Sequence, residues 1–261
     1  MKKMIAQQNN IQYINLLTVP DIVAISTCRG CVIEGDNYSG FNACHYTGDD
    51  DTHVINCRMQ LCEMLGISYD NLIIPRQTHS LNIAIVNTLP IDKSNIENVD
   101  ALVTTLNDVA IAVNTADCVP VVMVDKVAGV KAVVHSGWKG TVGRICSLTV
   151  EKMRSLGAEL SHIKVVMGPC ICGDCFEVGD EVVEQFIQNG FDDEDVILRN
   201  YGVKSHIDLP QACRKSLIEI GVLDENISLP TECSRCNPEK FFSARRLGIN
   251  SGRTLTLIVE K

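Results

Sequence analysis

The chain has 261 residues, 46% of them hydrophobic and 21% charged, which is an ordinary balance for a globular protein with a sizeable core. Its formal net charge of -9 argues against nucleic acid or an anionic membrane as a partner, because both attract a basic surface. No segment reaches the roughly 18 to 20 apolar residues that span a bilayer, and no apolar segment of a signal peptide follows the two lysines near the start. We therefore expect a cytoplasmic protein.

The 13 cysteines are an odd number in a chain of this size, which favours reduced thiols over a disulfide framework. We expect some of them to pack as small hydrophobic side chains and others to bind metal. The sequence contains no internal repeat, low-complexity tract or linker rich in proline and serine. Residues 1–261 are therefore predicted to form a single domain.

The first predicted elements are a strand over residues 22–26 and a helix over residues 52–65, which Thr52 would cap and Gly66 would end. A series of short segments rich in β-branched residues follows, each bounded by turn residues, as is typical of strands. These strands are predicted at residues 83–86, 101–104, 109–113, 119–124 and 130–134.

The second half of the chain mixes helices with two more predicted strands, at residues 163–167 and 254–259. Apolar residues at helical spacing predict one helix over residues 138–156, and further helices are predicted over 180–188 and 208–220. Asp208 would cap the last of these, with Pro210 in its first turn. Because helices and strands do not alternate strictly, we predict an α/β fold of mixed β-sheets in a layered sandwich flanked by helices, not a doubly wound parallel sheet.

An ionisable pair, Asp117 and Cys118, stands at the start of the predicted strand in the segment TADCVPVVMVD. Burying an unpaired charge is costly, so the pair is either a capping device or a functional site. His79, in IIPRQTHS, and His135, in KAVVHSGWKGT, also lie at the ends of apolar segments.

Two histidines and a cysteine, His79, His135 and Cys118, could converge on one tetrahedral zinc site. Three protein ligands would leave a fourth position for water or substrate, which is typical of catalytic zinc. Asp117 could then orient a ligand or act as an acid or base. The spacing matches no local metal-binding pattern, so packed or solvated histidines are the alternative.

The glycine-rich turn HSGWKGTVGR leads into a predicted helix and lacks the order of a Walker motif. Its free backbone N–H groups, with Lys139 nearby, could bind an anion. The alternative is a tight turn with an exposed lysine.

Several motifs resemble those of one family, in the same order along the chain. It is the YfiH-like laccase-domain family, whose members are also called polyphenol oxidase or purine nucleoside phosphorylase proteins. The resemblance covers nearly the whole chain. It implies a single α/β domain with layered sheets, and a zinc site formed by His79, Cys118 and His135. The motifs are RQTHS, TADCVPVV, HSGWKGT, GPCICGDCFEVGDEV, HIDLPQACRKSLIEIGV and TECSRCNPEKFFSARRLGINSGR.

The activities that the resemblance implies are purine nucleoside phosphorolysis, adenosine deamination and cleavage of methylthioadenosine. The expected ligands are therefore a purine nucleoside, such as adenosine or inosine, and phosphate. Phosphorolysis needs cations for phosphate, and Arg245 and Arg246 are the best candidates because guanidinium groups bind phosphate bidentately. Lys139 and Arg58 are further candidates, and Asn42 could contact ribose or hold a turn.

Three other interpretations stay open. Cys118 could be the nucleophile of a thiol hydrolase with His79 or His135 as its base. A polyphenol oxidase would need copper, and six scattered histidines are few for a multicopper array. The chain could also be a non-catalytic zinc module, because C-x2-C pairs occur within CICGDC, residues 170–175, and as CSRC, residues 233–236.

Overall fold

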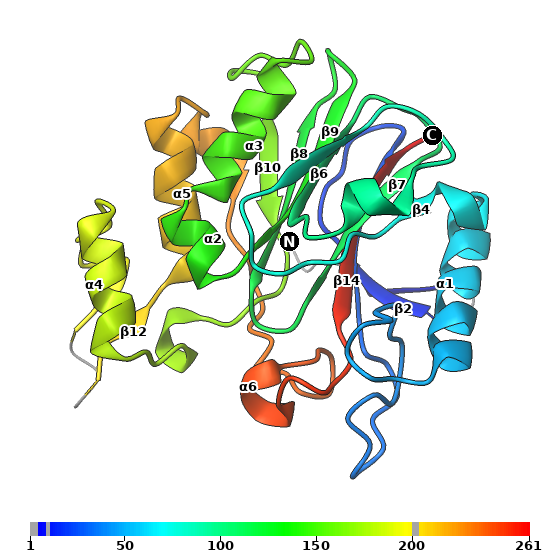
Figure 1. Cartoon of the computed structure of the whole chain (residues 1–261), viewed down its shortest axis with the longest axis horizontal. Coiled ribbons are helices and arrows are strands. Elements are labelled where there is room, and N and C mark those ends of the chain that lie inside the picture. The colour runs from blue at the N-terminus through cyan, green and yellow to red at the C-terminus, as the bar shows by residue number, and fades with distance from the viewer. Residues whose placement is uncertain (1–4, 9–10, 200–203) are drawn as a thin grey trace.

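The computed structural model describes residues 5–8, 11–199 and 204–261, and Figure 1 shows their arrangement in layers. Within these residues, two six-stranded sheets pack against each other, and helices cover their outer faces. Each sheet contains both parallel and antiparallel pairs, which confirms the predicted mixed α/β sandwich. No helix in the described residues is long and apolar enough to cross a bilayer.

The first sheet joins the start of the chain to its end. All of its neighbouring strands are antiparallel except the last pair, β7 and β4, which are parallel. In spatial order it contains β1 (Ile5–Gln8), β2 (Ile11–Asn15), β3 (Ile22–Thr27), β14 (Thr254–Glu260), β7 (Ala110–Thr115) and β4 (Leu72–Ile73).

The second sheet is antiparallel at its centre and parallel at both edges. In spatial order it contains β13 (Ile227–Ser228), β10 (Lys164–Met167), β8 (Val119–Asp125), β9 (Val130–Ser136), β6 (Ala101–Thr104) and β5 (Ile83–Val86). A small separate sheet pairs β11 (Ile197–Leu198) with β12 (His206–Ile207).

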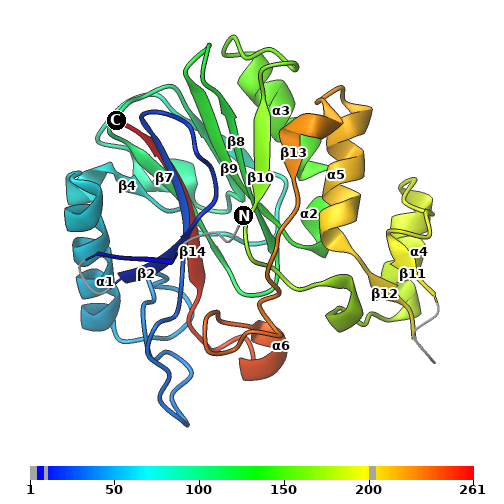
Figure 2. The same ribbon diagram turned by 180° about the vertical axis from the view of Figure 1, so that it is seen from behind.

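The helices lie on opposite outer faces of this sandwich, as the two ribbon views show (Figures 1 and 2). One side carries a single long helix, α1, packed on the first sheet. The other side carries α2, α3 and α5 on the second sheet, with α4 beyond them, while α6 lies at the end of the sheets. The bounds are α1 (Asp51–Leu65), α2 (Trp138–Val142), α3 (Ile145–Arg154), α4 (Asp180–Gln188), α5 (Leu209–Glu219) and α6 (Ala244–Leu247).

The eight predicted strands are all present, with ends shifted by at most two residues. Two helix predictions were wrong in detail. Asp50, not Thr52, caps α1, because its carboxylate accepts a hydrogen bond from the His53 N–H. The single helix predicted over residues 138–156 is two helices, α2 and α3, because Arg144 adopts the left-handed conformation, with φ of 59°.

Alternate side chains along a strand point to opposite faces of the second sheet, and both faces are buried. In β8, Val121 and Met123 pack toward the helices, whereas Val122 and Val124 pack between the two sheets. A charged pair also lies between the sheets: Lys131 of β9 is fully buried, and its Nζ lies 2.6 Å from the Glu260 Oε2.

Candidate active site

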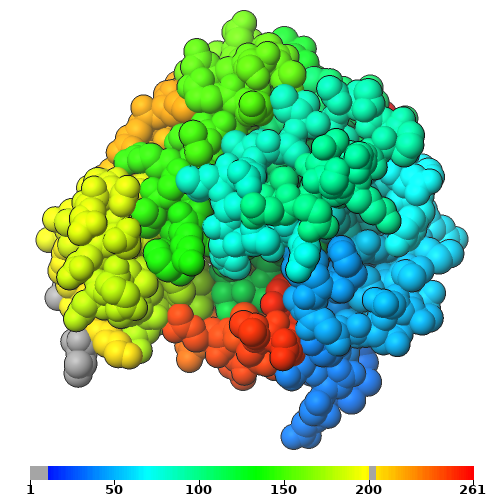
Figure 3. All heavy atoms as spheres, viewed as in Figure 1, coloured from blue at the N-terminus to red at the C-terminus, as the bar shows by residue number. Residues whose placement is uncertain are grey.

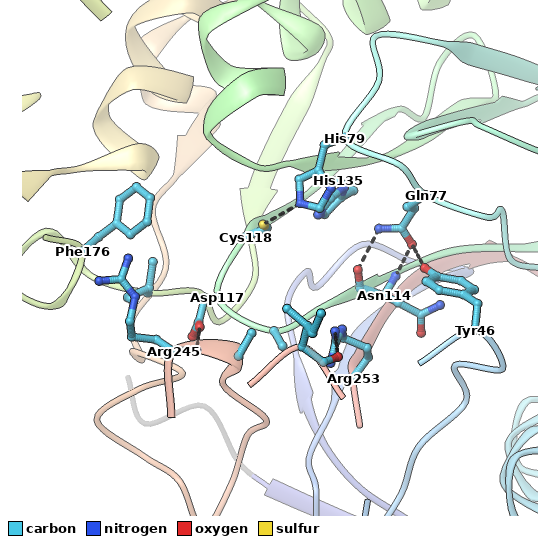
Figure 4. Close-up of a pocket in the computed structure, with 14 residues that line it drawn as sticks. Tyr46, Gln77, His79, Asn114, Asp117, Cys118, His135, Phe176, Arg245 and Arg253 are labelled. Atoms are coloured by element: carbon cyan, nitrogen blue, oxygen red, sulfur yellow. Dashed lines mark hydrogen bonds between the residues drawn. The ribbon is translucent and has the colours of Figure 1, made fainter. Parts of the chain in front are cut away.

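His79, Cys118 and His135 meet at the end of the sandwich that α6 covers. Cys118 directly precedes β8, His135 lies near the end of the antiparallel neighbour β9, and His79 lies in the loop between β4 and β5. One ligand atom from each residue lies within 4.8 Å of the others, and the Cys118 Sγ lies 3.8 Å from the His79 Nε2 (Figure 4). The chemistry of these ligands therefore fits a three-ligand metal site.

Asp100, at the residue before β6, organises both histidines and was missed in the sequence. Its Oδ1 lies 2.7 Å from the Nδ1 of His135, which leaves the Nε2 of that ring free for a metal. The same carboxylate accepts hydrogen bonds from the backbone N–H groups of Thr78, His79 and Ser80. Such a carboxylate fixes the orientation and tautomer of a ligating histidine.

Gly137 makes room for the three ligands. A Cβ at this position would lie 2.7 Å from the Cδ2 of His79 and 3.1 Å from the Sγ of Cys118. The glycine of HSGWKGT therefore allows close approach of the ligands. Anion binding by this turn stays a prediction: the turn leads into α2, which has five residues, and Lys139 is exposed.

Cys118, His135 and Asp100 shift one another's pKa values. Burial would raise the pKa of the Cys118 thiol, but the charge and hydrogen bonding of His135 and His79 outweigh it and lower the pKa to about 6. Burial opposes the charged form of His135, but Cys118 and Asp100 raise its pKa to about 9. Burial likewise opposes ionised Asp100, and hydrogen bonds from His135 and Ser80 lower its pKa to about 2. A thiolate is thus available to bind metal at neutral pH.

A cavity of about 420 Å³ opens beside the three ligands, a size suited to a small organic substrate. Segments far apart in the sequence form this side of the molecule: orange and red residues near the C-terminus lie next to blue residues of the N-terminal part (Figure 3). The lining residues come from both sheets and from the α6 segment, and His79, Cys118 and His135 lie on one wall.

Asp117 lines this cavity and also joins two segments near it, through Ser234 and Arg245. Its Oδ1 accepts a hydrogen bond of 2.7 Å from the Ser234 hydroxyl, and its Oδ2 accepts one of 2.7 Å from the backbone N–H of Arg245. The residue adopts a left-handed conformation with φ of 90°. An acid or base role for Asp117 stays a prediction, and the geometry adds a structural role for it.

The structure brings one of the five expected binding residues, Arg245, to the cavity wall. Its guanidinium lies over the Phe176 ring and donates a hydrogen bond to the Glu177 carbonyl. Arg246 is exposed next to it but does not line the cavity, and neither does the exposed Lys139.

The other two expected binding residues lie elsewhere. Arg58 lines a second cavity, where its Nη2 lies 2.8 Å from the Nδ1 of His45. Asn42 is fully buried and accepts a hydrogen bond from the backbone N–H of Arg253. It therefore holds the backbone of Arg253, which lines the cavity. That arrangement fits the turn-holding alternative for Asn42.

The cavity also contains polar and aromatic residues that the sequence did not single out. Gln77 bridges the backbone of Asn114 through both ends of its amide and contacts the Tyr46 hydroxyl (Figure 4). The Asn114 side chain is buried, and neither of its amide atoms has a hydrogen-bond partner in the described residues. The Q of RQTHS was the available signal, because it directly precedes the Thr–His pair of the site. The additional lining residues are Tyr46, Gln77, Asn114, Phe176 and Arg253.

A family model described as "Multi-copper polyphenol oxidoreductase laccase" matches residues 23–261. The chain belongs to this laccase-type family. Its relatives include "Adenosine deaminase RL5" of an unknown prokaryotic organism, 50% identical over 94% of this chain and 96% of the relative. Another is "Purine nucleoside phosphorylase" of Bacteroides thetaiotaomicron, 37% identical over 90% of both chains.

Solved structures of two similar proteins agree with the fold. The Bacillus licheniformis hypothetical protein YfiH superposes with a TM-score of 0.88 at 25% identity and 97% coverage of both chains. YlmD of Geobacillus stearothermophilus superposes with a TM-score of 0.87 at 27% identity and 99% coverage of both. The resemblance to the YfiH-like family in the sequence is therefore confirmed.

Proposed function

We propose that the chain is a zinc-dependent purine nucleoside phosphorylase that acts on adenosine, inosine and methylthioadenosine and also deaminates adenosine. The observation that carries the proposal is the group of His79, Cys118 and His135 on the wall of a cavity of about 420 Å³. The printed names of the relatives, adenosine deaminase and purine nucleoside phosphorylase, support the substrate class. We also propose that residues 1–261 form one domain.

The donor set suits zinc. Imidazole nitrogen and thiolate sulfur are ligands that zinc accepts, Asp100 orients His135, and Gly137 leaves space between the ligands. Three ligands leave one position that faces the cavity. A zinc ion bound there would supply a Lewis acid for the reaction.

The purine is assigned to the part of the cavity that Tyr46 and Asn114 line (Figure 4). An aromatic ring offers a stacking surface for a base, and a free side-chain amide can pair with the N6 and N7 edge of adenine. Asn114 is buried, so a ligand that satisfies its amide would remove the cost of an unpaired polar group. This supports recognition of a purine.

Phosphate is assigned to Arg245, the exposed arginine on the cavity wall. Its place over Phe176 orients the guanidinium, and its charge offsets the repulsion of phosphate by the net charge of -9. Proton transfer is assigned to Asp117, the carboxylate next to Cys118 in the cavity lining. Arg253 is less available, because its guanidinium already donates to the carbonyls of Ile249, Ser251 and Gly252.

A thiol hydrolase is the second candidate, because the Cys118 Sγ lies 3.8 Å from the His79 Nε2, close enough for a nucleophile and its base. Copper is less suited than zinc as the resident metal: in the described residues the metal-binding groups together contain only two histidines. Metal analysis separates the three possibilities, because a thiol nucleophile must be free of metal.

The test is product analysis of zinc-loaded protein supplied with adenosine, with and without phosphate. We expect adenine and ribose 1-phosphate only when phosphate is present, and inosine in both conditions. The Cys118→Ala variant should form none of these products, whereas the exposed Cys31→Ala control should match the parent. Failure to turn over adenosine, inosine and methylthioadenosine would overturn the proposal, and active-site labelling of Cys118 would then test the hydrolase.

A further inference from the structure

Four cysteines outside the cavity form a second cluster, which we name the four-cysteine cluster: Cys172, Cys175, Cys233 and Cys236. Each pair has C-x2-C spacing, and the pairs lie on two loops, one after β10 and one after β13. All four Sγ atoms lie within 4.8 Å of one another. The two loops run side by side in Figure 2 and are joined by a β-bridge between Cys170 and Cys233.

The distances within the four-cysteine cluster fit a tetrahedral metal better than disulfides. The Cys175 and Cys236 Sγ atoms are 3.4 Å apart, well beyond a disulfide bond of about 2.05 Å. A tetrahedron with Zn–S bonds of about 2.3 Å places sulfurs about 3.8 Å apart. The backbone N–H of Cys172 also donates to the Cys233 sulfur at 3.3 Å, a hydrogen bond that stabilises a thiolate.

We propose that the four-cysteine cluster binds a structural zinc ion. Four thiolates complete a tetrahedral shell, so this site would keep no position open for substrate. A zinc ion with four thiolates carries a net charge of -2, and Arg235, between the two cysteines of the second loop, would offset part of that charge. Cys236 is exposed and the other three ligands are half-buried, so a metal ion can enter from solvent.

The zinc ion would join two loops that form part of the cavity wall. The first loop carries Ile171 and Phe176, both of which line the cavity. The second carries Ser234, which lies between the two cysteines of its pair and donates to Asp117. Asp117 in turn accepts from the backbone of Arg245. The four-cysteine cluster is therefore a positioning element for Phe176, Asp117 and Arg245.

Zinc stoichiometry, measured by elemental analysis of the purified full-length chain, tests this proposal without any assay of activity. The parent should contain about two zinc ions per chain and the Cys31→Ala control the same number. The Cys118→Ala variant, with an intact four-cysteine cluster, should retain one. The Cys175→Ser/Cys236→Ser variant should also retain one, held by the cavity ligands.

Cobalt substitution supplies a second measurement that does not depend on folding of the double serine variant. Cobalt-loaded Cys118→Ala should show the intense charge-transfer absorption of a tetrahedral thiolate site. A Cys118→Ala protein free of metal, four-cysteine thiols found as disulfides by mass spectrometry, or iron in place of zinc would each overturn the proposal. Because these readouts involve no nucleoside, they stand whether or not the proposed activity does.

The effect on the cavity is measured by steady-state kinetics of the Cys175→Ser/Cys236→Ser variant, which depends on the proposed function. We expect a several-fold rise in KM for adenosine with a smaller change in kcat, because the cavity zinc ligands are retained. An unchanged KM in a variant that has lost one zinc ion would contradict the positioning role of the cluster. The proposal that the cluster binds zinc in the parent would still hold.

Discussion

The two candidate metal-binding groups, the cavity ligands His79, Cys118 and His135 and the four-cysteine cluster, differ in how the chain brings their residues together. His79, Cys118 and His135 come from separate parts of the chain, and the Asp100 carboxylate holds the ring of His135 and the backbone of His79. The four-cysteine cluster comes from two short C-x2-C loops, and its sulfurs contact a backbone N–H and one another. The first group is open toward a cavity, and the second can close around an ion. Open and closed ligand sets are the marks of catalytic and structural metal sites, respectively.

Removal of a cavity ligand should give the largest difference between the two groups. Cys118→Ala is expected to lower kcat/KM for adenosine by more than ~100-fold, because even residues behind the ligands of a metal site contribute 10- to 100-fold. The melting temperature should change little, since the four-cysteine cluster remains. Steady-state kinetics and thermal melting check both expectations, and a large loss of stability with activity retained would reverse the assignment of the two groups.

Asp100 holds both histidines of the cavity, and Asp100→Asn tests its importance. The carboxylate accepts from His135 and from three backbone N–H groups, and an amide cannot replace both oxygens as acceptors. We expect a loss of about 10- to 100-fold in zinc affinity and activity. Competition with a metal indicator measures the affinity. Asp92→Asn, at an exposed helix cap, is the control and should bind zinc as the parent does.

Arg245 tests whether the cavity separates phosphate from the purine. Arg245→Met should raise KM for phosphate by roughly 10-fold or more, because a charged hydrogen bond contributes about 1.5–3 kcal/mol. Deamination, which uses no phosphate, should be retained. The exposed Arg154→Met variant is the control. An equal loss of both reactions would show that Arg245 does not act on phosphate, and a stronger effect of Arg246→Met would transfer the assignment to Arg246.

Ser234 connects the four-cysteine cluster to the cavity through one hydrogen bond. Ser234→Ala leaves one oxygen of Asp117 without its partner and should raise KM for adenosine by about 5-fold, corresponding to about 1 kcal/mol. Zinc content should stay that of the parent. Ser228→Ala, on the exposed face of β13, is the matched control. A loss of zinc in Ser234→Ala would mean that the serine supports the cluster itself.

Glu260 should affect stability and leave both metal groups unchanged. Glu260→Gln removes one partner of fully buried Lys131 and should cost about 3 kcal/mol of unfolding free energy at pH 7. Burial opposes ionised Glu260, but the hydrogen bonds from Lys126 and Lys131 lower its pKa. Its stabilisation is therefore present above the unfolded pKa of about 4.3 and lost as the pH falls through the lower folded pKa.

The difference between the parent and Glu260→Gln should accordingly disappear toward acid pH in urea unfolding experiments. Exposed Glu225→Gln should follow the parent at every pH. A difference that stays constant with pH would assign the effect to packing instead of charge.

The regular parts of the fold were predictable where burial and local chemistry agree. Strand β8 is apolar from Val119 to Val124, and α5 has Asp208 as its cap and Pro210 in its first turn, as predicted. The break at Arg144 was not predictable, because the apolar spacing continues through it. Strands β1 and β2 were also missed, since their glutamine- and asparagine-rich segment lacks strong alternation.

The candidate site was predictable to the extent that its residues carry distinctive chemistry. Histidine and cysteine at strand ends point to a metal even when they are far apart in sequence. Asp100 and Asn114 are ordinary residues whose importance comes from what the fold places beside them. The sequence shows that an arginine is charged but not which cavity it lines. Arg58 and Arg245 were both candidates for binding the ligand, yet they line different cavities.

Two cavity residues, His79 and Asp117, are held in left-handed backbone conformations, with φ of 61° and 90°. Such conformations cost about 1–3 kcal/mol each and persist only where the surrounding fold enforces them. The cavity ligands are thus preorganised before any ion arrives, and loading needs no folding step. A rigid, ready-made site of mixed nitrogen and sulfur donors would bind its ion directly in the folded chain, so the supply of zinc, and not the folding of the protein, would decide how much of the chain is loaded.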